Sequence, residues 1–166
     1  RIKKKKPKGH IEQLDPRKEA ASRIHADCET KKPCIPARML MSALINGGQF
    51  MRLDGKRQVS TKNTTVLPGL IVLDGDHFAL NPPSWEVDIQ QGRNPNGGEA
   101  VCLIRPRFDK WGFQVTFTLD DDAFSENQAR ELFDIVGSRV GIGDFRPQRK
   151  GTYGRFRIDR WQVVSK

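Results

Sequence analysis

The chain has no long apolar segment. Among its 166 residues, no run of apolar side chains approaches the ~18 residues that a membrane-spanning helix needs. No stretch near its beginning has the charged, apolar and small-residue pattern of a signal peptide either. We therefore expect neither a membrane span nor a membrane partner.

Cysteine is scarce, with Cys28, Cys34 and Cys102 as its three occurrences and no C-x-x-C pair among them. An odd number without paired spacing argues against a disulfide framework. A structural zinc site would need four ligands at tighter spacing. The sequence therefore predicts free thiols in a reducing cytoplasm, and no metal or other cofactor.

Catalytic signatures are also missing. The chain contains no G-x-S-x-G, no H-E-x-x-H and no recognisable cysteine–histidine arrangement. Its one G-x-G, at Gly141 and Gly143, follows an expected helix and precedes an expected strand. A phosphate-cradling loop requires the reverse order, with the glycines before a helix N-terminus, so we do not expect nucleotide hydrolysis.

Positive charge is what the chain has in excess: 29 Lys and Arg against 20 Asp and Glu give a net charge of +9. Residues 1–8 contribute +6 and residues 141–160 contribute +4, which leaves −1 for the rest of the chain. Clustered positive charge beside a nearly neutral body favours a polyanionic partner. We predict a basic flexible arm over residues 1–13 and a single domain over residues 14–166.

Local patterns predict three helices. Asp15 followed by Pro16 is typical of a helix start, and good helix formers continue to Ala26. A second helix follows Pro36, with apolar residues at helical spacing up to a stop at Gly47. A third begins at an S-x-x-Q capping box whose serine is Ser125, and its apolar face continues to residue 140.

The remaining patterns predict strands. We expect residues 69–73 to pair with 77–80, and residues 100–107 to form a hairpin with 111–119. Residues 155–164 form a last strand, and the polar residues 52–69 form a mobile loop. The fold class is then α+β, an antiparallel sheet backed by two helices. A ferredoxin-like (RRM-like) order fits if its first strand lies upstream of Arg1 or is absent, with the glycine-rich loop before the last strand.

The most informative segment is residues 141–160, where three properties coincide. Glycines let a backbone approach a ligand, arginines offer forked donors to phosphate, and aromatic rings offer surfaces for unstacked bases. The alternative is a flexible basic surface loop with Phe145 and Phe156 in the core. The candidate nucleic-acid-binding residues here are Gly141, Gly143, Arg146, Arg149, Lys150, Gly151, Tyr153, Gly154, Arg155 and Arg157.

Further cations and one further ring complete the predicted binding surface. Arg105 and Arg107 share one face of an expected strand, so both can point toward a bound polymer, although such pairs are also common on plain surfaces. Trp111 or Tyr153 offers a platform for a base. From the arm we add Lys3, Lys4, Lys5 and Lys6.

Three sequence stretches suggest a family. They are IPARMLMSALINGG at residues 35–48, RPRFDKW at 105–111 and VGIGDFRPQRKGTYGRF at 140–156. Together they resemble small phage-encoded, single-domain relatives of the RAMP superfamily, the RNA-binding subunits of CRISPR effector complexes, over most of the chain. The resemblance implies a ferredoxin-like fold in the cytoplasm of a bacterial host. It also implies that the glycine-rich loop contacts the nucleic-acid backbone through Gly141, Gly143, Arg146, Gly151, Gly154 and Arg155.

The basic segments predict a protein that binds single-stranded RNA or DNA without cleaving it, and the resemblance implies a phage protein that can assemble side by side along the strand. Two alternatives stay open. One is an RNA-processing endonuclease that uses a histidine as general acid–base. His25 or His10 would be its catalytic residue, with His25 as the candidate, although a lone histidine late in a helix is more typical of a surface or capping residue. The other is a phage inhibitor that mimics or joins a host CRISPR complex.

Overall fold

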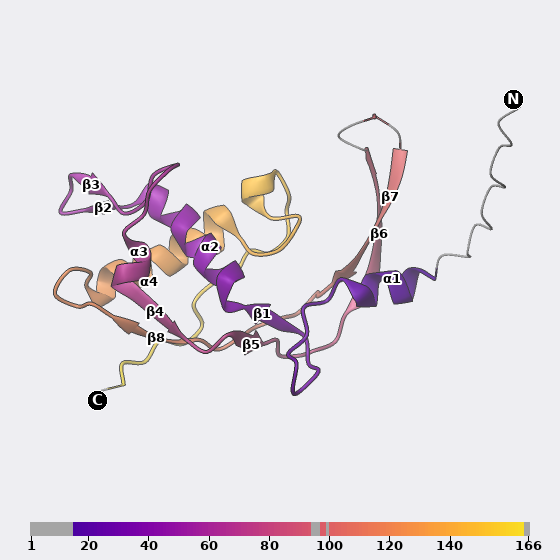
Figure 1. Ribbon diagram of the computed structural model, residues 1–166, viewed down its shortest axis with the longest axis horizontal. Coiled ribbons are helices and arrows are strands. Elements are labelled where there is room, and N and C mark those ends of the chain that lie inside the picture. Colours follow the sequence, from indigo (N-terminus) through magenta and orange to yellow (C-terminus); the bar gives the residue numbers. More distant parts are fainter. Residues whose placement is uncertain (1–14, 94–96, 99, 165–166) are drawn as a thin grey trace, which may run out of the picture. The chain divides into compact units, whose positions relative to one another are not determined.

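The computed structural model describes residues 15–93, 97–98 and 100–164, and these form two compact units (Figure 1). Unit 1 comprises the described residues within 1–33 and 80–112, and unit 2 those within 34–79 and 113–166. The domain predicted over residues 14–166 thus corresponds to two units, each with its own internal contacts. The predicted basic arm, residues 1–13, lies outside the described residues.

Unit 1 consists of helix α1 (Pro16–Ser22) packed against a long ribbon of two antiparallel strands, β6 (Glu86–Arg93) and β7 (Ala100–Arg107) (Figure 1). The carboxylate of Asp15 accepts hydrogen bonds from the backbone N–H groups of residues 17 and 18, which confirms the predicted helix start. The guanidinium of Arg17 lies 4.8 Å from the centre of the Trp85 ring. This cation–π contact links the first turn of the helix to the segment that enters the ribbon.

Unit 2 is built around helix α2 (Ala37–Gly47) and helix α4 (Glu126–Ile135), which contact each other. The π-helical turn η2 (Val136–Val140) extends α4 and also packs on α2. The predicted capping box is confirmed: Ser125 Oγ accepts from the Gln128 N–H, and the Gln128 side chain accepts from the Ser125 N–H. Local capping chemistry therefore starts α4 where the sequence predicts.

The strands of unit 2 are short and pair two by two, all antiparallel. Strand β1 (Cys34–Pro36) pairs with β5 (His77–Ala79), and β4 (Ile71–Asp74) pairs with β8 (Thr116–Leu119). Three further elements are the 3₁₀ turn η1 (Gly48–Phe50), the short helix α3 (Leu67–Leu70) and the 3₁₀ turn η3 (Pro147–Arg149). Residues 52–69, predicted as a loop, also contain the small hairpin of β2 (Arg52–Leu53) and β3 (Arg57–Gln58).

The core of unit 2 lies where these helices and strands meet. Its largest fully buried apolar side chains come from α2, α3, β4, α4, η2 and the segments that join them, and the biggest is Phe124. The ring of Phe117 on β8 stacks on Phe133 of α4, with 5.2 Å between the ring centres. This contact, between a half-buried and a buried ring, packs β8 against α4.

The α+β class is confirmed, but the predicted strand partners are wrong. Residues 100–107 pair with β6 rather than with 111–119, and β8 pairs with β4, which places Leu73 opposite Phe117. Residues 69–73 were expected to pair with 77–80, yet β4 and β5 belong to different sheets. β7 pairs with the strand that precedes it in sequence, whereas β4 and β8 are distant in sequence, and a short turn signal does not encode such a distant partner.

The predicted last strand, residues 155–164, forms no ladder among the described residues. Side chains hold the segment in place instead. The Phe156 ring meets the Phe113 ring edge to face at 6.0 Å, and the Trp161 indole N–H donates to the Glu126 carboxylate over 2.8 Å. The prediction of a strand over residues 155–164 is therefore wrong for the described residues.

None of the described helices is long and apolar enough to span a bilayer.

Candidate nucleic-acid interface

Residues 141–157, which we call the glycine loop, fold back on themselves. The N–H of Ile142 donates to the Gly154 carbonyl over 2.9 Å, and the N–H of Tyr153 donates to the Phe145 carbonyl over 2.9 Å. Between Phe145 and Tyr153 in sequence, the N–H of Gly151 donates to the Arg146 carbonyl, also over 2.9 Å. The segment is therefore a closed, hydrogen-bonded loop.

Two of its glycines are required by this closure. Gly154 has φ of +73°, and a Cβ there would overlap the carbonyl oxygen of Ile142. A Cβ on Gly151 would overlap the carbonyl of Phe145 in the same way. At Gly143, by contrast, an added Cβ would meet no atom within 4 Å. The glycine spacing thus has an internal structural cause, and only the surroundings of Gly143 are open.

The closed loop presents two aromatic rings at its surface. Phe145 and Tyr153 meet edge to face with 5.6 Å between their ring centres, and they remain 43% and 42% exposed. The alternative that placed Phe145 in the core is therefore wrong. Phe145 is the residue that the sequence interpretation left out of the site, although its charged neighbours Asp144 and Arg146 indicated a surface position.

The cations of the loop divide into two groups. Arg146 donates to the Gly143 carbonyl over 2.8 Å, and Arg155 donates to the Ser138 carbonyl over 2.8 Å, so both guanidiniums brace the backbone. The other cations are exposed, and within the described part of the chain their side chains form no hydrogen bond or ion pair. This second group is Arg149, Lys150 and Arg157.

The other predicted binding residues do not belong to the glycine loop. Arg105, Arg107 and Trp111 belong to unit 1, so they are not part of the loop, which belongs to unit 2. Three carboxylates surround Arg107, those of Asp109 at 2.7 Å and of Asp88 and Glu86 at 3.7 Å. Its charge is largely compensated within the ribbon, which makes it a poor phosphate ligand.

Two further candidates are also described within unit 1. Arg105 donates to the Ile104 carbonyl over 3.1 Å, and Trp111 is half-buried. Lys3, Lys4, Lys5 and Lys6 lie outside the described residues.

His25, the catalytic candidate, is an exposed residue of unit 1 beyond the end of α1. Within the described part of the chain, its side chain forms no hydrogen bond or ion pair. A general acid–base histidine is normally oriented by such a partner, and no described residue supplies one to His25. In the same described part, no group of three or more His, Cys, Asp or Glu side chains is arranged to hold a metal ion.

Comparison with known proteins does not assign the chain to a family. No family model matches the chain, and no curated protein matches it. The loop must therefore be judged by its own chemistry. It combines two exposed rings, which can stack on unstacked bases, with three exposed cations that form no ion pair with any described residue and can neutralise phosphates.

Proposed function

We propose that this protein binds single-stranded nucleic acid, RNA or DNA, through the glycine loop and does not cleave it. The observation that carries the proposal is the exposed pair of Phe145 and Tyr153 on a loop that also carries exposed cations and whose backbone is internally braced. Rings at this exposure stack on bases of any sequence, and the cations track the sugar–phosphate backbone.

The bracing of the loop supports binding as well as folding. Arg146 and Arg155 hold backbone carbonyls, so the rings and the free cations keep their positions without a ligand. A binding surface that is already ordered loses less conformational entropy when a flexible strand docks on it. The braced arginines therefore contribute by positioning the loop, whereas Arg149, Lys150 and Arg157 contact phosphates.

Four further expectations go with this proposal. The RAMP-like family, its ferredoxin-like sheet, a phage source and assembly along the strand stay predictions from the sequence. Neither alternative, the histidine nuclease or the inhibitor of a host CRISPR complex, has a specific feature of the described residues in its favour.

Binding is expected to depend steeply on salt. Each phosphate contact on a single strand contributes about 0.7 to the slope of log K against log salt concentration, so three cations predict a slope of about −2 from the loop alone. Affinity should then fall at least about 20-fold between about 50 and 200 mM salt. Fluorescence anisotropy of a labelled single-stranded oligonucleotide, repeated across this range, measures the slope.

Two results would count against the proposal. Affinity that does not change with salt would exclude phosphate contacts as the basis of binding. Shortening of labelled RNA during incubation with the wild-type protein, lost in the His25→Ala variant, would favour the nuclease instead.

A further inference from the structure

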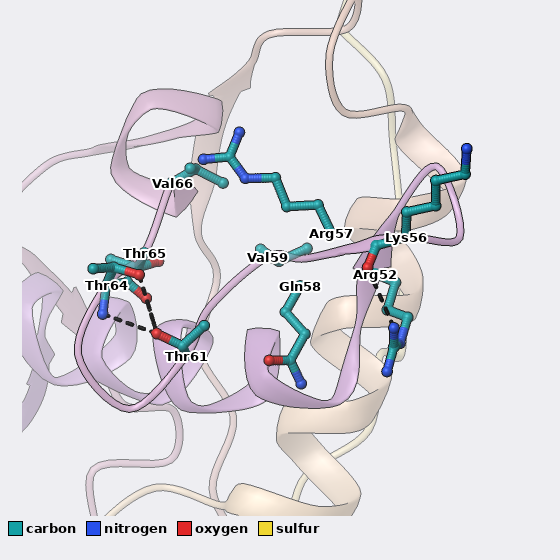
Figure 2. A pocket seen from close by; sticks show the side chains of 9 residues that line it. All are labelled: Arg52, Lys56, Arg57, Gln58, Val59, Thr61, Thr64, Thr65 and Val66. Atoms are coloured by element: carbon teal, nitrogen blue, oxygen red, sulfur yellow. Dashed lines mark hydrogen bonds between the residues drawn. The ribbon is translucent and has the colours of Figure 1, made fainter.

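A second basic feature of unit 2 lies at the small hairpin β2–β3, which the sequence interpretation treated as loop. The hairpin and the following residues enclose an open hollow of about 520 Å³ (Figure 2). No acidic side chain lines it. The polar lining residues that matter here are Arg52, Lys56, Arg57, Thr61, Thr64 and Thr65.

The threonines build one wall of this hollow. The hydroxyls of Thr61 and Thr64 lie 3.0 Å apart, and the Thr61 hydroxyl accepts the N–H of Thr64 over 3.1 Å (Figure 2). The hydroxyl of Thr65 lies 2.7 Å from that of Ser60, which is buried. These hydroxyls fold the segment into a fixed turn, and the cations are left to meet a ligand.

Arg57 is the cation best placed to do so. Figure 2 shows its side chain extending from β3 toward Val66, across the hollow, whereas Lys56 extends away from the other lining residues. Arg52 donates to the Lys56 carbonyl over 3.2 Å, so one of its guanidinium nitrogens already has a hydrogen-bond partner. Within the described residues, the exposed Arg57 side chain forms no hydrogen bond or ion pair.

Exposed residues connect the hollow to the glycine loop. Phe50 ends η1, two residues before Arg52, and its ring is 57% exposed. The guanidinium of Arg139 lies 5.6 Å from the centre of that ring. Its neighbour Ser138 accepts the hydrogen bond from Arg155 of the loop. A succession of exposed cations and one ring thus runs from Arg57 to the glycine loop within unit 2.

We propose that the hollow is a second phosphate-binding site for the strand held at the glycine loop, and that the strand passes Phe50 and Arg139 on its way there. This inference rests on the proposed function. A row of exposed cations with one ring suits a continuous single strand better than an isolated small anion, because cations and a ring repeat the chemistry of the loop. Arg57 supplies the forked donor to a phosphate inside the hollow.

Oligonucleotides of two lengths test the inference. One has about 4 nucleotides, enough for the loop alone, and the other about 16, enough to continue to a second site. Arg57→Ala is expected to weaken binding of the long oligonucleotide about tenfold, as the loss of one charge-assisted contact would, and to leave the short one unchanged. Its salt slope for the long oligonucleotide should fall by about 0.7.

Lys62→Ala is the matched control, because Lys62 is an exposed cation of the same segment that does not line the hollow. It should leave both affinities at the wild-type values. If the wild type binds neither oligonucleotide, the proposed function itself fails. If the wild type binds but Arg57→Ala behaves like Lys62→Ala, or weakens both lengths equally, the second site is refuted and the glycine loop stands.

Discussion

Replacing Gly154 with alanine is expected to lower the free energy of unfolding by about 3 kcal/mol and to abolish oligonucleotide binding. The residue has φ of +73°, and its new Cβ would overlap the carbonyl oxygen of Ile142. That carbonyl cannot retreat easily, because Ile142 is 92% buried, at 8% exposure. Relieving this overlap would move Gly154 away from Ile142. The hydrogen bond from the Ile142 N–H to the Gly154 carbonyl, which closes the loop, would then break.

Gly143→Ala is the matched control for this variant. Gly143 also has a positive φ, +94°, but an added Cβ would meet no atom within 4 Å. It should therefore cost only the backbone strain, about 1 kcal/mol, and retain binding. Urea unfolding of the two variants measures the difference. Equal stability of the two would contradict the explanation of the glycine spacing by loop closure.

Replacing both Phe145 and Tyr153 with alanine is expected to weaken oligonucleotide binding about 100-fold, because each base stacked on a ring contributes about 1–3 kcal/mol. Both rings are more than two-fifths exposed, so the fold should keep most of its stability. The salt slope should not change, since Arg149, Lys150 and Arg157 remain. Anisotropy titrations at several salt concentrations separate the two quantities.

Val72→Ala serves as the control for the ring variant. Val72 lies on β4 and is 60% exposed, so it removes apolar surface of unit 2 outside the glycine loop. Its affinity should match the wild type. Binding by the ring variant that equals the wild type would show that the rings do not stack on bases.

Helix starts could be predicted from the sequence because their determinants are local. Asp15 caps α1, and the box of Ser125 and Gln128 caps α4, each within three residues of the groups it satisfies. The end of α1 was less predictable. Good helix formers continue to residue 26, but the helix ends at Ser22 because nothing beyond it is buried enough to extend the packing.

Strand partners could not be predicted, because tertiary packing decides them. The turn at Asp109 and Lys110 suggested a hairpin, yet Asp109 forms an ion pair with Arg107 and the chain leaves the ribbon there. β8 pairs with β4, and its half-buried Phe117 ring stacks on Phe133 of α4, which lies more than ten residues further along the chain. A two-residue turn signal carries no information about that contact.

The segment that forms the candidate site could be proposed from the sequence, but the roles of its individual residues could not. The sequence placed glycines, cations and Tyr153 in one segment, and the structure keeps them in one loop. It could not tell that Arg146 and Arg155 bind backbone carbonyls, because such bonds depend on how the loop closes. Nor could it separate a glycine that approaches a ligand from one that approaches its own backbone, as Gly154 does.

Photocrosslinking tests the central claim most directly. The wild-type protein, bound to a single-stranded oligonucleotide, is irradiated with ultraviolet light and digested, and mass spectrometry locates the crosslinked residues. The account predicts crosslinks at Phe145 or Tyr153, because stacked rings lie in contact with bases. Crosslinks confined to residues outside 141–157 would contradict it.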